Sequence, residues 1–374
     1  LGEGSFHGGF AVDAGGGARH GDAHAGLGLR HENADHRVAR GGVRELHVGG
    51  LLGLREADRG DDLAVAQRRL EQAHEEFVGG NLALVGDDGR VIGIPTDVGG
   101  AAIAYRTDLF KAAGLPTDPA KVSALWPTWD KYTEVGKNYK AKTKKSFLDS
   151  SGTVFAAILN QGTQKYYDRN GGLIYSTNAQ VKTAFNGASK ALASGIGSNI
   201  SQFTSDWNTG LNKGSFATVI APAWMLAYIK NLAPSTKGKW NVAALPGGGG
   251  NIGGSQLSIP ASAKNPKEAM AFIKWYLSPE MQLKVFKDYG LFPSAKVLYD
   301  DQTVLGYKDP FFNNAPVGKI YGDGVKKLKP IFGGKLQRCI DMAMGSAILL
   351  VANGKEKVPA KAFATGIAAA GKCK

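Results

Sequence analysis

The strongest constraint in this sequence is an abrupt change in amino-acid composition near residue 110. Up to that point the chain has 11 arginines, 17 acidic residues and no lysine, whereas the remainder has 32 lysines and two arginines. All seven histidines lie within the first 74 residues, and the first tyrosine is Tyr105. One folded domain does not normally divide its residue types in this way. We therefore expect the 374 residues to form more than one part.

Composition excludes several classes of protein. The chain is 43% hydrophobic and 21% charged, which is a globular balance, and no stretch approaches the ~18 apolar residues of a membrane-spanning helix. Two cysteines, Cys339 and Cys373, are too few for a disulfide-dense scaffold or a four-cysteine zinc site. The formal charge of +13 raises nucleic acid as a partner. Because the lysines are spread singly along predicted helices, we predict no nucleic-acid binding.

Residues 1–80 form an anomalous segment, rich in Gly, Ala, Arg, His and Asp, with one candidate helix at 61–77. Three interpretations stay open: a disordered or fused tail, an unusual domain, and a mis-assigned start or out-of-frame translation of GC-rich DNA. The third interpretation explains the residue composition best. No signal peptide is expected in the residues that follow Leu1. His20 and His24 have the spacing of two helical metal ligands, but neighbouring glycines disfavour a helix, so we predict no metal site.

From residue 84 the sequence alternates between strand and helix patterns. A hairpin is predicted over 84–95 with its turn at Asp88 and Gly89, and the strand within 100–110 leads into a short helix that ends at Gly114. Further helices are expected at 127–141, 153–161, 179–194, 204–213 and 225–233, as an amphipathic pair over 266–290, and in most of the chain after 311. Further strands are expected at 215–224, 241–246 and 255–260. The alternation predicts an α/β fold with largely parallel sheets.

Seven blocks of this part stand in a characteristic order and spacing. They are GIPTDVGGAAIAYRTDLFKAAGLP (93–116), PTWDKY (127–132), KGSFATVIAPAW (213–224), NVAALPGGGGNIGGSQLSIP (241–260), KNPKEAMAFIKWYLSPEMQ (264–282), GLFPS (290–294) and DPFFNNAPVGKIYGDGVKKL (309–328). Together they resemble the family 1 extracellular solute-binding proteins of bacterial carbohydrate ABC transporters, the group that includes maltose-binding protein. That family begins with a signal peptide and a strand–helix–strand unit, and neither is recognisable in residues 1–80.

The resemblance implies a two-lobed periplasmic-binding-protein-like fold (type II) that closes on a sugar. On the family's pattern lobe one comprises 84–112 and 250–296, without its first unit and so at risk of being incomplete, and lobe two comprises 113–245 and 297–374. The protein would be the substrate-binding component of an ABC sugar importer, a monomer that delivers a mono- or oligosaccharide to membrane permease subunits. It would need no cofactor, perform no catalysis, and work outside the cell or in the periplasm, membrane-anchored in the intact parent.

Sugars are held by aromatic faces that stack on their C–H surfaces and by polar groups that hydrogen-bond their hydroxyls. The resemblance and the strand-end positions predict these ligand contacts: Trp224, Asp97, Thr96, Gly253, Gly254, Gln256, Trp207, Tyr166 and Arg338, with Tyr167 as a further stacking candidate. The alternatives are a core role for Trp224, a turn cap for Asp97, a mobile surface loop for the glycines and a salt bridge for Arg338. The remaining tryptophans are expected to pack: Trp126, Trp129, Trp240 and Trp275, the last on an apolar stripe with Ala271 and Phe272.

The same residues also bear on two other functions. After residue 110 there is no histidine, which excludes a Ser-His-Asp triad there, and a glycosidase pair of Asp97 with Asp206 or Asp323 has nothing to single it out. A nearer alternative is the binding of a uronate or other acidic ligand, which the positive charge would steer. The sequence leaves open whether Cys339 and Cys373 pair; a disulfide between them would join the C-terminal tail to the preceding helix if the protein matures outside the cytoplasm.

Overall fold

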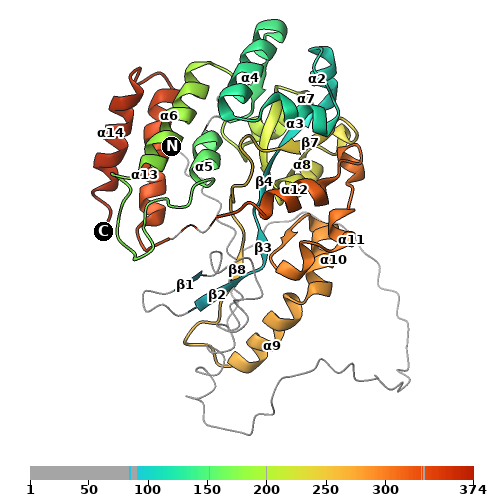
Figure 1. Ribbon diagram of the computed structural model, residues 1–374, viewed down its shortest axis with the longest axis vertical. Coiled ribbons are helices and arrows are strands. Elements are labelled where there is room, and N and C mark those ends of the chain that lie inside the picture. Colours follow the sequence, from blue (N-terminus) through green and yellow to red (C-terminus); the bar gives the residue numbers. More distant parts are fainter. Residues whose placement is uncertain (1–83, 86–90, 151, 199, 330, 332) are drawn as a thin grey trace, which may run out of the picture. The chain divides into compact units, whose positions relative to one another are not determined.

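A computed structural model describes residues 84–85, 91–150, 152–198, 200–329, 331 and 333–374 (Figure 1). Several sequence predictions lie outside these residues: the anomalous segment 1–80, the candidate helix at 61–77, the histidine pair His20 and His24, and the hairpin turn at Asp88 and Gly89. The two strands of that hairpin are present and antiparallel, with Leu84 opposite Gly93.

The described elements follow the predicted alternation of strands and helices. The strands are β1 (Leu84–Val85), β2 (Val91–Pro95), β3 (Asp97–Val98), β4 (Ala101–Arg106), β5 (Ser146–Leu148), β6 (Phe216–Pro222), β7 (Trp240–Ala244), β8 (Gln256–Leu257) and β9 (Phe292–Pro293). The α-helices are α2 (Thr107–Ala112), α3 (Pro119–Leu125), α4 (Trp129–Thr143), α5 (Gly152–Leu159), α6 (Ala179–Ala193), α7 (Ser205–Lys213), α8 (Met225–Leu232), α9 (Pro266–Tyr276), α10 (Pro279–Tyr289), α11 (Gln302–Leu305), α12 (Val317–Val325), α13 (Gln337–Ala352) and α14 (Pro359–Ala370). The short 3-10 turns are η1 (Pro234–Thr236), η2 (Lys296–Leu298) and η3 (Pro310–Phe312).

The main sheet has the strand order β5-β6-β4-β7, and its directions differ from the prediction. β4 runs antiparallel to both of its neighbours, with Ile103 opposite Ile220 on one side and Ala243 on the other, while β5 and β6 are parallel. β6 and β7 therefore point the same way, and α8 carries the chain across between them. The expectation of largely parallel sheets was wrong because β4 is inserted, reversed, between two strands that a helical crossover joins.

Two hydrophobic cores cover the two faces of this sheet. Alternate residues of β4 divide between them, with Ala102 and Ala104 in the first core and Ile103 and Tyr105 in the second. The first core includes residues of α8, α9, α10 and α12, and the second includes residues of α4, α5, α6 and α13. The first core continues past the sheet into β2, β3 and β9. The described residues belong to one compact unit, and the lobe boundaries given above remain predictions.

Three stretches of chain run side by side at the N-terminal end of β4, and we call them the crossing (91–101, 250–257 and 292–295). β2 pairs with β8, β3 pairs with β9, and Gly100 bridges Asn251. The backbones approach closely at Gly99, whose carbonyl accepts a 2.7 Å hydrogen bond from Ile252 N. A Cβ on Gly99 would lie 2.1 Å from Ile252 O, so this contact excludes any side chain.

The C-terminal helices α13 and α14 pack against each other and against α6 (Figure 1). Cys339, in α13, is bonded to Cys373, just after α14, with 5.9 Å between their Cα atoms. The structure thus shows a disulfide that the sequence left open. No helix of the described part of the chain has the length and apolar character to span a bilayer.

The tryptophans predicted to pack do so with one exception. Trp126 and Trp240 are buried, and Trp129 packs against the second core while its Nε1 donates to Gln161. Trp275 is 55% exposed, so its assignment to the core was wrong. The reason lies in α9, which carries a second apolar stripe including Met270 and Ile273, and the fold buries that stripe instead. Phe272 and Ala271, the other residues of the predicted stripe, are exposed with Trp275.

Candidate functional site

Six of the predicted ligand contacts lie in or beside the crossing. They are Thr96, Asp97, Trp224, Gly253, Gly254 and Gln256. Asp97 opens β3, Gln256 opens β8, and the two glycines precede Gln256 on an exposed loop. Trp224 follows β6, whose last residue, Pro222, lies opposite Ala101 at the start of β4. The register of the sheet thus carries Trp224 to the crossing.

The Asp97 side chain is buried, and its hydrogen bonds from described residues all reach one of its two carboxylate oxygens. Its Oδ1 accepts hydrogen bonds of 2.8 Å from Thr96 Oγ1 and from Ser255 N. None of the described residues donates to Oδ2. Burial raises the pKa of Asp97, and the bonds from Ser255 and Thr96 oppose that rise. The pKa of Tyr276 in α9 is raised by burial and by the charge of Asp97, so the Tyr276 phenol lies close enough to interact electrostatically with the Asp97 carboxylate.

Two glycines let the backbone pass between Trp224 and Asp97. Gly253 has φ +83° and Gly254 has φ +104°, both in the region that favours glycine. A Cβ on Gly253 would lie 3.1 Å from Trp224 Nε1, and one on Gly254 would lie 3.0 Å from Asp97 O. The indole Nε1 of Trp224 donates to Ile252 O at 2.9 Å, which fixes the ring beside this loop. Trp224 is half-buried, so part of its ring is free to contact a ligand.

Three aromatic side chains form a contiguous surface, which we call the aromatic wall (Phe203, Trp224 and Tyr228). Phe203 stacks on Trp224 with 6.3 Å between ring centroids and 25° between planes. Tyr228 meets both rings edge-on, at 5.5 Å from Phe203 and 5.9 Å from Trp224. Phe203 and Tyr228 are each 48% exposed. The wall therefore offers accessible ring surface next to the glycines and Asp97.

Phe203 and Tyr228 were not predicted. The signal for Tyr228 was available, because it stands four residues after Trp224 in a predicted helix and so shares its face. Phe203 carried no such signal, since it comes from a loop that meets α8 only through tertiary folding.

Trp207 and Tyr166, both predicted to stack on a ligand, have no exposed ring face. Both side chains are fully buried. The Trp207 indole donates to Asp149 Oδ2 at 2.8 Å, and its ring lies 5.6 Å from that of Phe203. The Tyr166 hydroxyl donates to Asp341 at 2.9 Å. Trp207 thus supports the aromatic wall without belonging to its surface, and Tyr166 packs in the second core.

Two further candidates, Tyr167 and Arg338, are not brought to the crossing. Tyr167 is buried in the second core, and its hydroxyl accepts a 2.9 Å bond from Leu336 N. Arg338 is exposed in the first turn of α13, a helix that packs on the second core. Gln256 is exposed within the crossing and pairs with Pro95.

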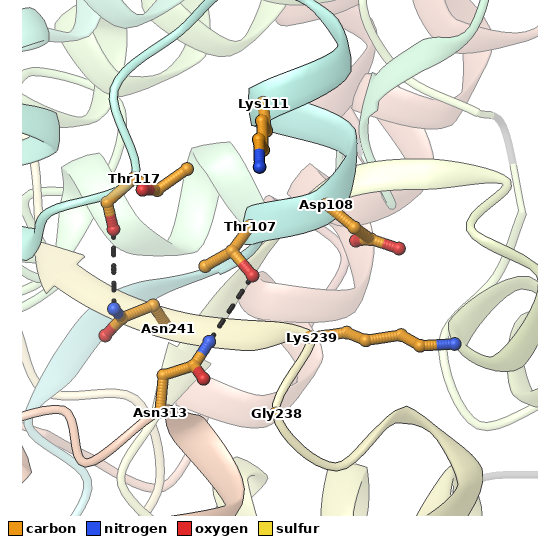
Figure 2. Close-up of a pocket in the computed structure, with 8 residues that line it drawn as sticks. All are labelled: Thr107, Asp108, Lys111, Thr117, Gly238, Lys239, Asn241 and Asn313. Atoms are coloured by element: carbon orange, nitrogen blue, oxygen red, sulfur yellow. Dashed lines mark hydrogen bonds between the residues drawn. The ribbon is translucent and has the colours of Figure 1, made fainter.

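A separate pocket of about 310 Å³ lies beyond the C-terminal end of β4 (Figure 2). It is lined by Thr107, Asp108, Lys111, Thr117, Gly238, Lys239, Asn241 and Asn313. Two hydrogen bonds of 3.4 Å cross its lining, from Asn241 to Thr117 O and from Asn313 to Thr107 Oγ1 (Figure 2). No aromatic ring is among these lining residues, so this pocket lacks a stacking surface.

Comparison with known proteins identifies the family of the chain. The family profile described as bacterial extracellular solute-binding protein matches residues 68–312, which is more than half of the sequence. The chain belongs to this family. The match starts within the anomalous segment 1–80, so it reaches further toward the N-terminus than the resemblance of the sequence blocks.

Two curated relatives of the solute-binding protein are named for sugars. It is 26% identical over 332 residues to the arabinooligosaccharide-binding protein of Bacillus subtilis, covering 82% of this chain and 73% of the relative. It is 27% identical over 274 residues to the lactose-binding protein of Rhizobium radiobacter, covering 69% of this chain and 62% of the relative.

A solved structure supports the fold of this solute-binding protein. A crystal structure titled as an extracellular solute-binding protein of family 1 aligns with a TM-score of 0.70 and 33% identity, covering 83% of this chain and 84% of that one. The predicted family and its two-lobed α/β fold are confirmed. The family comprises substrate-binding proteins rather than enzymes, which agrees with the prediction of a carrier.

Proposed function

We propose that this protein binds a neutral oligosaccharide at the crossing and delivers it to the permease of an ABC importer. The family is one of extracellular solute-binding proteins, and two of the curated relatives are named for an arabinooligosaccharide and for lactose. In this proposal the protein acts as a monomer without catalysis, outside the cell, and is membrane-anchored in its parent form.

The aromatic wall is the observation that carries the proposal. Trp224 lies against the exposed backbone at Gly253 and packs edge-on with Tyr228, and Asp97 lies next to Gly254 with one carboxylate oxygen that accepts no bond from the described residues. Ring faces for C–H surfaces and a carboxylate for hydroxyls are the two devices that sugar recognition needs. Because the wall comprises more than one ring, it suits a ligand longer than a monosaccharide.

The charge at the site favours a neutral ligand over a uronate. Asp97 brings a carboxylate among the residues of the site, and a second carboxylate on a ligand would be repelled by it. The lysine-rich composition of the chain acts at long range, where salt screens it within about 10 Å.

The proposal also favours a carrier over a glycosidase. The two partners considered for Asp97 are both exposed, Asp206 in the first turn of α7 and Asp323 in an ion pair with Lys319 at 2.9 Å. Neither carboxylate lies in the apolar, water-excluded surroundings that a general acid of this kind needs.

The test is calorimetric titration of the full chain with arabinotriose, lactose and galacturonic acid. We expect binding of at least one of the neutral sugars, and we expect Trp224→Ala to weaken it by roughly tenfold or more, since a stacked ring contributes on the order of 1 kcal/mol beyond its buried area. The matched control is Trp275→Ala, which removes an exposed tryptophan from α9 and should leave the affinity unchanged.

Two results would contradict the proposal. Binding of galacturonic acid without either neutral sugar would favour the acidic-ligand alternative. An equal loss of affinity in the Trp224 and Trp275 variants would show that the aromatic wall is not the binding surface.

A further inference from the structure

Asp149 is a buried carboxylate that the site described above does not use. It follows β5 directly, is fully buried, and accepts through Oδ2 two hydrogen bonds of 2.8 Å, from Trp207 Nε1 and from Gln202 Nε2. Its Oδ1 has no partner among the described residues. Burying a carboxylate is unfavourable, and burial raises the pKa of Asp149 to about 6, so hydrophobic packing alone does not account for its position.

Both donors to Asp149 come from the chain around Phe203. Gln202 is the residue before Phe203, and the Trp207 ring lies 5.6 Å from the Phe203 ring. The main chain of Asp149 holds the same segment, because its carbonyl accepts a bond from Ser198 Oγ. Asp149 is therefore hydrogen-bonded to Ser198 and Gln202, which precede Phe203, and to Trp207, which follows it.

Phe203 needs such support because its backbone is in the left-handed region, at φ +65°. An L-residue rarely adopts this conformation unless its neighbours hold it there. On the other side of Phe203, Thr204 caps α7, with its Oγ1 accepting from Trp207 N at 3.3 Å and donating to Ser201 O at 2.8 Å. The left-handed backbone turns the half-exposed Phe203 ring onto Trp224.

We infer that Asp149 is a positioning residue that sets the aromatic wall, acting through Gln202 and Trp207 to hold Phe203 against Trp224. Its effect on ligand binding rests on the proposed function, whereas its effect on the loop does not. The chemistry is specific: two N–H donors meet at one carboxylate oxygen, so a side chain without an acceptor leaves both unsatisfied.

The experiment compares Asp149→Leu, Asp149→Asn and Gln202→Ala by limited chymotrypsin digestion of the folded full chain. Cleavage after Phe203 reports opening of the loop, and cleavage after the exposed Trp275 serves as the internal reference. The control Asp341→Ala removes another carboxylate with two donors, Lys165 at 2.7 Å and Tyr166 at 2.9 Å, at a distance from the wall. Titration with lactose and arabinotriose follows on the same variants.

We expect Asp149→Leu to raise cleavage after Phe203, relative to Trp275, by roughly tenfold, since the buried N–H donors of Gln202 and Trp207 then lose their acceptor. Gln202→Ala should raise it by a smaller factor. Asp149→Asn keeps an acceptor oxygen and should restore resistance to near wild type, and Asp341→Ala should not change the ratio. Affinity for the sugar should fall in the same order.

An unchanged cleavage ratio in both Asp149→Leu and Gln202→Ala overturns the inference. If Asp149→Leu does not fold, the Gln202→Ala ratio decides it. A raised ratio with no loss of affinity for either sugar keeps the positioning role and counts against the proposed sugar site instead.

Discussion

At the scale of the residue, Phe203 shows how an unfavourable backbone conformation accompanies an exposed ring. Its φ of +65° carries a cost of about 1–2 kcal/mol for an L-residue. The ring gains little burial in return, since it is 48% exposed. Backbone strain at an exposed aromatic residue is more readily explained by ligand recognition than by stability of the fold.

Substituting Phe203 separates these two effects. Phe203→Gly and Phe203→Ala both remove the ring, but only glycine tolerates the left-handed backbone, so we expect Phe203→Gly to be more stable than Phe203→Ala by about 1 kcal/mol. Urea unfolding measures that difference. Both variants should bind lactose or arabinotriose more weakly than wild type. A lower stability for the glycine variant would show that the backbone is not strained at this position.

The residues of the candidate site were predictable to different degrees. Thr96, Asp97 and the two glycines lie at strand ends, which sequence patterns locate well, and the structure brings them together with Trp224. Their role in ligand binding remains a prediction. The sequence did not show that Trp207 is buried in the first core, because its contact with Phe216 joins a helix to a strand and leaves no periodic signal.

At the scale of the element, most helices and strands occur close to the predicted bounds, whereas the directions in which the strands pair differ from the prediction. The segment predicted as a helix at 179–194 spans Ala179–Ala193, and that at 204–213 spans Ser205–Lys213. The prediction of strand direction was wrong because hydrophobic alternation is the same in parallel and antiparallel strands. In α9 the sequence contained two apolar stripes, and only tertiary packing decides which is buried.

The disulfide between α13 and the end of α14 should contribute strongly to stability. It closes a loop with a sequence separation of 34 residues. A loop of this length restricts the unfolded chain by about 3–4 kcal/mol in the chain-entropy model. We therefore expect Cys339→Ser with Cys373→Ser to lower the free energy of unfolding by about 2–4 kcal/mol, measured by urea denaturation. The reduced wild type should match the double variant, and a difference between them would show that the serines themselves disturb the packing.

At the scale of the whole molecule, the buried Asp149 makes stability depend on pH. Its pKa is about 6 in the folded protein, against a model-compound value of 3.8, so the folded state binds the proton more tightly. The stabilisation from this group is thus present at low pH and lost as the pH rises from about 4 to about 6. Relative to Asp149→Asn, the wild type should lose about 2 kcal/mol between pH 4 and pH 7, measured by urea unfolding at each pH.

A carboxylate with the opposite shift provides the control. Asp301 caps α11, and the hydrogen bonds from Thr303 hold its pKa below the ordinary value. Relative to Asp301→Asn, the wild type should gain stability as the pH rises through the acidic range. The same sign for both aspartates would mean that the Asp149 carboxyl is not the source of the pH dependence.

The link between Cys339 and Cys373 also bears on the order of events in the life of the chain. Thiols of this kind stay reduced in the cytosol and oxidise in the extracytoplasmic space where this family works. Cys373 follows α14, so the bond forms only after both α13 and α14 have been synthesised. In a chain that is exported before its thiols oxidise, α13 and α14 would be joined covalently only outside the cytoplasm. The disulfide would then add its resistance to unfolding after the chain has crossed the membrane.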